Sequence, residues 1–289
     1  MNFLILGSTG YLGSKLINSL VENGNSVVGT IRENSDISRL ENIQDKIRLI
    51  PADVAAIETS MQYEKYDWII NVAGNYGRST KLYQSVLLSN IDFPLYILDL
   101  AAEKKVPNYM TISTGLPEEM NMYSFSKGIF ARFGKFYSEK HDINFFNMKL
   151  QMFYGADEPL DRFLPQMVFK LIRGEDVNVT LGTQHRDIVS VEDVIGAVMA
   201  VINSNDKGYH DIEVGSGEAP TIKEILEYIK AECNSVSNIN YGSIPMRRDE
   251  PDCIANLKQL NEYGYSIKYD WKSGLSKMIK EMKSDENSN

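Results

Sequence analysis

The sequence predicts an α/β protein in which a doubly wound parallel sheet is followed by a smaller C-terminal α/β domain. Through the first half of the 289 residues, short apolar runs of strand type alternate with longer stretches of helical period, as in a parallel sheet. After about residue 150 the alternation loosens, and helical stretches are separated by short strands and by turns such as Gly215-Ser216-Gly217. The length is sufficient for one large domain or two closely joined domains.

Strands of the first half are expected in mostly apolar runs, because a strand buried on both faces has no solvent-facing side. These runs cover 2–7, 26–31, 46–50, 67–73, 108–113 and 143–150. Helices are expected at 11–23, 82–104 and 124–140, where apolar residues recur three and four apart. Pro94 predicts a kink in the second of these helices. The same period predicts later helices near 162–173, 192–203, 221–232, 256–263 and 273–283.

We expect a first domain over residues 1–155 with a return segment near 183–205, a second domain over 156–283, and a disordered tail at 284–289. Hydrophobic residues make up 43% and charged residues 24%, as in ordinary globular proteins. The apolar runs are shorter than a membrane span, and the N-terminus lacks the features of a signal peptide. Two cysteines provide no disulfide framework. The expected location is therefore the cytoplasm, with no membrane partner.

Three glycines stand three residues apart between the first predicted strand and the first predicted helix, at Gly7, Gly10 and Gly13. A turn at this place points backbone N–H groups and the positive end of a helix at a ligand. Glycine also lets a pyrophosphate approach the backbone. The simpler interpretation is that the glycines only form a turn. Their position after the first strand, with a second strand at 26–31, favours a dinucleotide site.

A tyrosine and a lysine four residues apart, Tyr123 and Lys127, share one face of a predicted helix. A lysine ammonium near a phenol favours the phenolate and lowers the pKa of the tyrosine. Such a tyrosine can exchange a proton near neutral pH. The spacing by itself is common. Here it follows a predicted strand that ends in Ser113-Thr114, and ligands of open parallel sheets bind at the carboxyl ends of strands.

Taken together, these motifs resemble the extended short-chain dehydrogenase/reductase family of the NAD-dependent epimerase/dehydratase type, which has a Rossmann-type fold. The resemblance covers nearly the whole chain. It includes the segments 71–74, 154–155 and 186–193, which match the family patterns N-x-A-G, Y-G and R-D-[IFY]-V-x-V-x-D, with Glu192 before the last acid. It implies a catalytic group of Tyr123, Lys127 and Thr114, with Ser113 beside it. The cofactor-binding positions that it implies are Gly7, Ser8, Thr9, Gly10, Tyr11, Leu12, Gly13, Arg32, Asp53, Val54, Val72, Ala73, Gly74, Asn90 and Lys127.

Two departures from the family pattern bear on the reaction type. Thr114 and Tyr123 are only nine residues apart, so the loop between them is short. Thr114 is followed by Gly115 and Leu116, where the 4,6-dehydratases of the family carry an Asp-Glu pair that removes water. The pattern also lacks the cysteine–histidine pair of the epimerase-reductases, because the chain's two cysteines and three histidines lie outside its catalytic motifs. Hydride transfer with one proton remains, as in a ketone reductase or a C4 epimerase.

The end of the second predicted strand bears on the choice of nicotinamide cofactor. NAD-specific proteins place an acid there for the ribose hydroxyls, whereas this chain has Ile31 followed by Arg32. An arginine can hold a 2′-phosphate by a charge-assisted hydrogen bond. The alternative is that Arg32 is only a solvated charge and that Glu33 binds the ribose. We expect NADP.

The net charge of −9, without a basic run, argues against nucleic acid as a partner, and a diphosphate would need local arginines. The resemblance implies that the second half binds a nucleoside-diphosphate sugar. Each of the arginines is also a possible surface ion-pair partner. The predicted substrate-binding residues are Tyr76, Arg78, Arg162, Arg186, Arg247 and Arg248.

Within the family, the motif order and the segment 71–77 are most similar to CDP-abequose and CDP-paratose synthases and to dTDP-sugar 4-keto reductases. The predicted function is NADPH-dependent reduction of the 4-keto group of a nucleoside-diphosphate 4-keto-6-deoxyhexose, in deoxysugar and O-antigen polysaccharide biosynthesis. The alternatives are an NAD-dependent nucleotide-sugar 4-epimerase and a non-catalytic NADP-binding sensor. The resemblance also implies a homodimer paired through the helices at 82–104 and 124–140. No metal site is expected.

Overall fold

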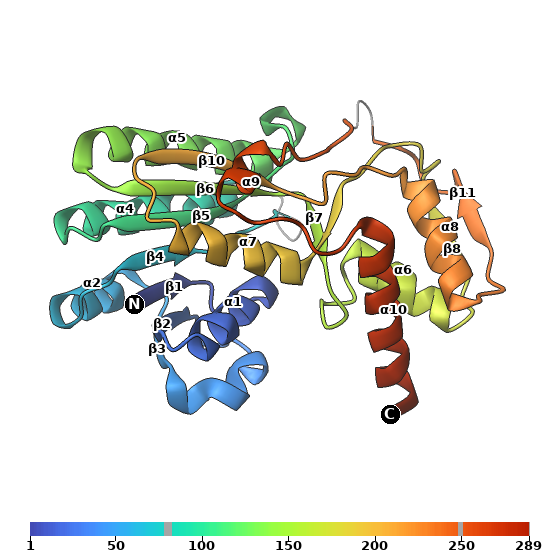
Figure 1. Cartoon of the computed structure of the whole chain (residues 1–289), viewed down its shortest axis with the longest axis horizontal. Helices are drawn as coiled ribbons and strands as arrows, with labels where there is room; N and C mark the ends of the chain where they lie inside the picture. Colours follow the sequence, from blue (N-terminus) through green and yellow to red (C-terminus); the bar gives the residue numbers. More distant parts are fainter. Residues whose placement is uncertain (78–82, 248–250, 289) are drawn as a thin grey trace. The chain divides into compact units, whose positions relative to one another are not determined.

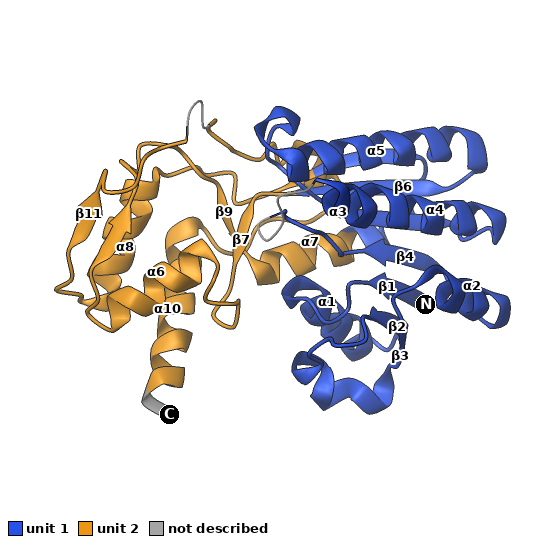
Figure 2. Ribbon diagram, turned by 180° about the vertical axis from the view of Figure 1, so that it is seen from behind, with its two compact units in different colours: residues 1–149, 201–212 blue, residues 150–200, 213–289 orange. Residues whose placement is uncertain are grey.

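The computed structural model describes residues 1–77, 83–247 and 251–288 (Figure 1). The chain divides into two compact units (Figure 2). Unit 1 contains residues 1–149 and 201–212, and unit 2 contains residues 150–200 and 213–289. The sequence predicts a return segment near 183–205, and the later residues grouped with unit 1 are 201–212. Strand β10 (Tyr209–Val214) completes the sheet that the first half begins.

The central sheet has seven strands in the order β10-β6-β5-β4-β1-β2-β3. Its other members are β1 (Asn2–Leu6), β2 (Ser26–Ile31), β3 (Arg48–Pro51), β4 (Trp68–Asn71), β5 (Asn108–Thr114) and β6 (Asn144–Leu150). The ladders that join β3, β2, β1, β4 and β5 are all parallel. The strand order reverses direction between β1 and β4, which places a ligand-binding crevice at the carboxyl ends of these two strands. The doubly wound, Rossmann-type sheet predicted from the sequence is confirmed.

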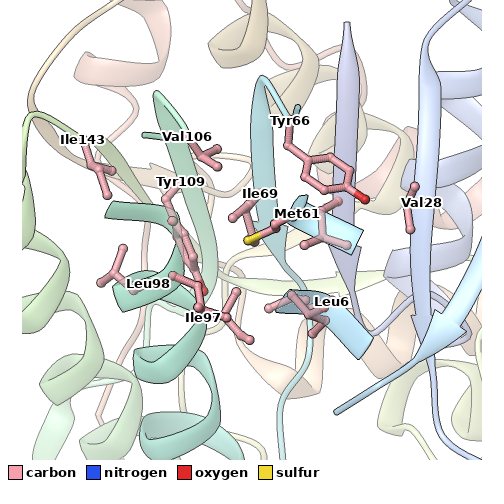
Figure 3. Packing of buried hydrophobic residues seen from close by; sticks show 14 of the residues in the cluster. Leu6, Val28, Met61, Tyr66, Ile69, Ile97, Leu98, Val106, Tyr109 and Ile143 are labelled. Carbon is pink, nitrogen blue, oxygen red and sulfur yellow. The ribbon is translucent and has the colours of Figure 1, made fainter. Parts of the chain in front are cut away.

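Helices α2 (Val54–Tyr63), α4 (Phe93–Glu103) and α5 (Met122–His141) pack beside one another, α2 against α4 and α4 against α5. Helix α1 (Tyr11–Glu22) packs on β1 and β2. The apolar face of β1 meets residues of α2, α4 and α5 in one buried cluster, which Figure 3 shows around Leu6, Ile69, Ile97 and Tyr109. Burial of apolar side chains such as these is the dominant favourable contribution to folding.

The predicted helix at 82–104 is observed as three pieces: α3 (Gln84–Leu87), a π-helical turn η2 (Leu88–Asp92) and α4. Pro94 sits in the first turn of α4, where proline is well tolerated because that N–H has no intrahelical partner. The predicted break is therefore real, but it takes the form of a wide turn before the proline. Residue 82 lies outside the described residues. The whole stretch Gln84–Glu103 is long and apolar enough to cross a membrane by length and composition alone, yet Ile97, Leu98 and Ala101 belong to the buried cluster.

Unit 2 has its own apolar core, to which helices α6 (Phe163–Ile172), α8 (Ile222–Cys233) and α10 (Trp271–Ser288) contribute. Its strands form two small parallel pairs, β7 (Met152–Tyr154) with β9 (Ile188–Ser190) and β8 (Val177–Val179) with β11 (Ile239–Tyr241). Helix α7 (Val191–Asn203) and the short helix α9 (Lys258–Glu262) complete the described helices of the second half.

Three features differ from the sequence prediction. The helix α2 and the 3₁₀ segment η1 (Ser38–Lys46) were not predicted, because α2 carries only three buried residues and η1 only two. The end at 284–289 was expected to be disordered, but α10 continues through Ser288. After Gly274 this helix contains neither glycine nor proline, so nothing in its sequence interrupts the backbone hydrogen bonds.

Candidate active site

The glycine turn joins β1 to α1, and two of its three glycines are required by the protein's own packing. Gly7 has a φ of +88°, and a Cβ at this position would lie 2.8 Å from the backbone nitrogen of Ala73. A Cβ at Gly13 would lie 2.2 Å from the carbonyl oxygen of Gly7. At Gly10 the nearest atom would be that same oxygen at 3.4 Å, and the residue is exposed. The fold therefore accepts a side chain at Gly10, where only a ligand would exclude one.

The other predicted residues of this turn are buried or half-buried. Ser8 is fully buried and donates its hydroxyl to the carbonyl oxygen of Ile5, so its side chain supports the strand. Tyr11 and Leu12 are buried at the start of α1, and Thr9 is half-buried. What the turn offers to a ligand is consequently its backbone and the N-terminus of α1.

The ends of β2 and β3 carry the predicted adenosine-side residues. Arg32 is exposed directly after β2, and its backbone is fixed by hydrogen bonds to and from Ser35. Within the described ranges, no carboxylate lies at ion-pair distance from the Arg32 guanidinium. Asp53 follows β3 and caps α2, accepting the N–H of Ala56 at 2.8 Å, while Val54 packs against the buried cluster.

Lys127 is held by the ends of two neighbouring strands. Its Nζ donates to the carbonyl oxygen of Ala73 at 3.0 Å and to that of Ile112 at 2.9 Å. Only 2% of Lys127 is exposed, and this burial lowers the pKa of its ammonium to about 8. An ammonium has three donors, so one remains after these two bonds. The arrangement fixes a cation at the carboxyl edge of β4 and β5.

Tyr123 lies beside this cation, on the same face of α5. The Nζ of Lys127 is 6.0 Å from the centre of the Tyr123 ring. Gly74 comes close to both, since a Cβ there would lie 3.5 Å from Lys127 Nζ and 3.6 Å from Tyr123 Cε2. Val72 continues β4 toward this place by donating its N–H to the carbonyl oxygen of Leu6. The structure thus brings together Tyr123, Lys127 and the 72–74 segment, as the sequence predicts.

A buried asparagine clamps the loop after β4 to α5. Asn90, in the π-helical turn η2, accepts the N–H of Asn75 at 2.8 Å and donates to the carbonyl oxygen of Asn75 at 3.0 Å. It also donates to Ser126 Oγ, and Ser126 in turn donates to the carbonyl oxygen of Tyr123. Sequence analysis assigned Asn90 to the cofactor and missed Asn75 and Ser126. No sequence motif marks Asn75 and Ser126, because they meet Asn90 only through the tertiary fold, at the π-helical turn η2.

The short loop after β5 is also pinned to α5. Thr114 is the half-buried last residue of β5, and its Oγ1 accepts the N–H of Leu116, while Ser113 is buried. Glu118, the first acid after Thr114, pairs with Arg132 at 2.5 Å, and its carbonyl oxygen accepts the hydroxyl of Ser124. The Glu118 carboxylate is therefore bonded to a side chain of α5.

In unit 2, the R-D segment holds its own chain together. Arg186 is 5% exposed and donates from Nη1 to the carbonyl oxygens of His185 and Pro251. Asp187 is fully buried and accepts four hydrogen bonds, from the N–H and hydroxyl of Ser216 and from the N–H groups of Gly217 and Ala255. Burial raises the pKa of the Asp187 carboxyl, although the four donors oppose that rise.

The second acid of this motif, Asp193, is also fully buried. It accepts hydrogen bonds from the Tyr265 hydroxyl and from the N–H groups of Lys268 and Tyr269. The two acids therefore fasten the segments 215–217, 255 and 265–269 to the core of unit 2.

The remaining arginines predicted to bind the substrate lie apart in the sequence of unit 2 or lie outside the described residues. Arg162 is half-buried at the start of α6, and Arg247 is exposed in a segment without regular structure. Arg78 and Arg248 lie outside the described residues. The assignment of these arginines to a diphosphate stays a prediction.

One cavity of unit 1 is lined by residues other than the predicted site residues. The described residues contain no group of three or more His, Cys, Asp or Glu side chains that could hold a metal ion. A cavity of about 380 Å³ opens between β3 and α2, beside Ile50, Ala56 and Tyr63. None of its lining residues is a predicted site residue, and it lies away from Tyr123 and Lys127 in the sequence and the sheet order.

The chain is similar to known proteins along most of its length. The model of the NAD dependent epimerase/dehydratase family matches residues 3–215. The chain is similar to the CDP-abequose synthase of Salmonella muenchen, with 29% identity over 286 residues that cover 96% of each chain. It is also similar to a putative UDP-glucose 4-epimerase of Methanocaldococcus jannaschii, with 22% identity and 98% of each chain covered.

Solved structures show the same fold. The UDP-glucose 4-epimerase of Thermotoga maritima matches with a TM-score of 0.89 over 99% of each chain, at 18% identity. A dTDP-glucose 4,6-dehydratase of Bacillus anthracis matches with a TM-score of 0.86, at 18% identity over 99% of this chain and 98% of that chain. Because the family model spans well over half of the 289 residues, this chain belongs to the NAD dependent epimerase/dehydratase family of enzymes, which act on nucleotide sugars.

Proposed function

We propose that this enzyme reduces the 4-keto group of a nucleoside-diphosphate 4-keto-6-deoxyhexose with NADPH. The observation that carries the proposal is the pairing of Tyr123 with a buried Lys127 cation at the carboxyl edge of β4 and β5. Similarity to a CDP-abequose synthase over 96% of the chain supports a deoxysugar substrate and a place in surface-polysaccharide biosynthesis.

The residues of unit 1 fit a dinucleotide. The exposed Gly10 leaves room over the N-terminus of α1 for a pyrophosphate, and Arg32 is available at the end of β2 for a 2′-phosphate. The third donor of Lys127 is available for the nicotinamide ribose. When bound, the nicotinamide supplies the hydride.

The chain's own residues would supply the proton and stabilise charge. Tyr123 donates its phenolic proton to the oxygen that develops at C4 of the sugar. Lys127 keeps a positive charge beside the phenol, which favours the loss of that proton. The Thr114 hydroxyl, which accepts from Leu116, still has its own proton to donate to the same oxygen.

Reduction is favoured over elimination by the loop after β5. Loss of water would need an acid and a base beside the sugar. Gly115 and Leu116 carry neither, and the Glu118 carboxylate is paired with Arg132. The rival function is a 4-epimerase with tightly held NAD, since relatives in both sequence and structure are named UDP-glucose 4-epimerases.

A homodimer in the cytoplasm completes the proposal. Large apolar side chains are exposed on the α3–α4 and α5 segments, where a partner's equivalent helices would cover them. These side chains are Leu87, Leu88, Tyr96, Phe125, Phe133 and Phe136. Light scattering tests the dimer: the proposal expects twice the chain mass, and charged residues at Leu88 and Phe133 should return the protein to the monomer mass.

The proposed reaction is tested by incubating the purified enzyme with NADPH and a panel of CDP-, dTDP-, GDP- and UDP-linked 4-keto-6-deoxyhexoses. A reductase consumes one NADPH per sugar reduced with at least one member of the panel. Turnover of 4-hydroxy nucleotide sugars without net NADPH loss, by protein that carries bound NAD through purification, would instead establish the epimerase.

A further inference from the structure

The loop that follows β4 places an aromatic side chain directly on the ring of Tyr123. The Tyr76 ring is stacked on the Tyr123 ring, with centroids 4.6 Å apart and planes inclined by 29°. Aromatic pairs in this range attract each other beyond the area that they bury. Tyr76 is 40% exposed, so burial in the core is not what holds it in place.

The backbone on both sides of Tyr76 is fixed by hydrogen bonds. Asn75 has both its N–H and its carbonyl oxygen bonded to the Asn90 amide. The Asn75 side chain accepts the N–H of Gly77 at 2.9 Å and donates to the carbonyl oxygen of Ser85 at 3.3 Å. Gly77 has a φ of +71°, which glycine adopts at little cost. These hydrogen bonds thus fix the backbone from which the Tyr76 side chain extends.

The same clamp reaches the helical turn that carries Tyr123. Asn90 donates to Ser126 Oγ at 2.9 Å, and Ser126 donates to the carbonyl oxygen of Tyr123 at 2.8 Å. The loop and the helix are therefore joined twice, by hydrogen bonds through Asn90 and by the stacked rings.

A proton donor has to be held within hydrogen-bond reach of the reacting oxygen, and a small misplacement reduces the rate. The Tyr123 side chain turns about two rotatable bonds and is only half-buried, so the helix alone does not fix its phenol. Gly74 lies at the edge of its ring and provides no side chain to support it. The ring of Tyr76, in contrast, is stacked on the ring of Tyr123.

We propose that Tyr76 is a positioning residue whose ring, and not its hydroxyl, holds the Tyr123 phenol in the orientation required for proton transfer. This inference rests on the proposed role of Tyr123 as proton donor. It gives Tyr76 a different task from the sugar contact predicted from the sequence.

The kinetic test compares Tyr76→Phe, which keeps the ring, with Tyr76→Leu, which removes it. The substrate is the panel sugar that the wild type reduces with the highest kcat/KM. Tyr76→Phe should keep kcat and KM within about twofold of the wild type. Tyr76→Leu should lower kcat by roughly three- to tenfold, the loss expected for one aromatic pair, with KM nearly unchanged. Tyr63→Leu on α2, which removes an 83% exposed tyrosine, is the matched control and should change neither constant.

Two kinetic results would overturn the inference. If Tyr76→Phe is as impaired as Tyr76→Leu, the hydroxyl is what matters, as for a direct substrate contact. If Tyr76→Leu raises KM with kcat intact, Tyr76 contributes to binding rather than to positioning.

A second readout does not depend on the reaction. With 3-fluorotyrosine incorporated at position 123, the ¹⁹F resonance reports the environment of that ring. The stack predicts a shifted, sharp signal in the wild type and in Tyr76→Phe, and a signal that moves toward the free amino acid in Tyr76→Leu. An unchanged signal in Tyr76→Leu would refute the stack. If no panel sugar is reduced, the proposed function fails, and this spectrum still decides whether Tyr76 orients Tyr123.

Discussion

The two units carry motifs of the same family but use the polar side chains of those motifs differently. In unit 1, Gly10 and Arg32 are exposed, and the buried Lys127 retains one donor after bonding to two carbonyl oxygens. In unit 2, Asp187 accepts four hydrogen bonds from other residues of the unit. Arg186 donates to the carbonyl oxygens of His185 and Pro251.

This difference shows that some motif residues of one family are available to a ligand, whereas others stabilise the fold. Residues that serve a ligand keep an accessible polar group, whereas residues that serve the fold have theirs bonded internally. Substitutions at the accessible site positions of unit 1, such as Gly10 and Arg32, should therefore change turnover or cofactor binding at constant stability. Substitutions in the R-D segment of unit 2 should change stability first.

The largest expected effect is on turnover. Tyr123→Phe removes the proposed proton donor but keeps the ring and its stack with Tyr76. Turnover should fall by about 10² or more, the usual contribution of a positioned acid, while the melting temperature and NADPH affinity stay near wild type. Steady-state kinetics and calorimetry measure both, with Tyr63→Phe as the control. Retention of most of the wild-type kcat would contradict the assignment.

The R-D segment of unit 2 should respond in the opposite way. The Asp187 carboxylate accepts four hydrogen bonds, and Asp187→Asn replaces one of its two oxygens with an NH₂ group, which cannot accept them. Buried N–H groups, such as those of Gly217 and Ala255, can then lose their acceptor. We expect a loss of about 2–3 kcal/mol in the free energy of unfolding, measured with urea. Asp176→Asn removes an exposed carboxylate that also accepts two hydrogen bonds, and should cost less than about 1 kcal/mol. Equal effects of the two variants would show that Asp187 is not structural.

Substitutions of two glycines in the turn between β1 and α1 should distinguish an effect on stability from an effect on cofactor binding. Gly13→Ala forces a Cβ to within 2.2 Å of the Gly7 oxygen, so we expect about 1–3 kcal/mol of destabilisation. Gly10→Ala meets that oxygen at 3.4 Å and should keep the stability within about 0.5 kcal/mol while it weakens NADPH binding. Thermal unfolding and fluorescence titration distinguish the two. Normal NADPH affinity in Gly10→Ala would show that the pyrophosphate does not bind against this turn.

The smallest expected effect concerns cofactor choice. With Arg32 exposed at the end of β2, the wild type should prefer NADPH over NADH by about tenfold in kcat/KM, which corresponds to roughly 1.4 kcal/mol. Arg32→Ala should lose most of this preference by weakening NADPH alone. Arg39→Ala, in the exposed segment that follows, is the control. Equal use of both cofactors by the wild type would contradict the role of Arg32 and favour the alternative in which Glu33 binds the ribose.

The extent to which the sequence predicts this molecule differs between elements. Apolar runs predict the strands of the sheet well, because a strand that is buried on both faces is mostly apolar. The helix α2 is missed because only Ile57, Ser60 and Met61 are buried, which leaves a weak period.

For the candidate site, sequence spacing predicts that Tyr123 and Lys127 lie together, since four residues make one helical turn. It does not predict the stack of Tyr76 on Tyr123 or the clamp at Asn90. The two stacked rings are 47 residues apart, and Asn90 lies 15 residues from Asn75 and 36 from Ser126. Asn90 also lies in a π-helical turn that no local pattern indicates.

The central claim is that hydride is transferred to the sugar and stays there, and isotopic labelling tests it most directly. The enzyme is given NADPH deuterated at both C4 positions together with the 4-keto-6-deoxy sugar nucleotide. Mass spectrometry of the product should show one deuterium and one solvent proton added, with one equivalent of NADPH consumed. A product of unchanged mass without deuterium, or one lighter by a molecule of water, would contradict the reductase.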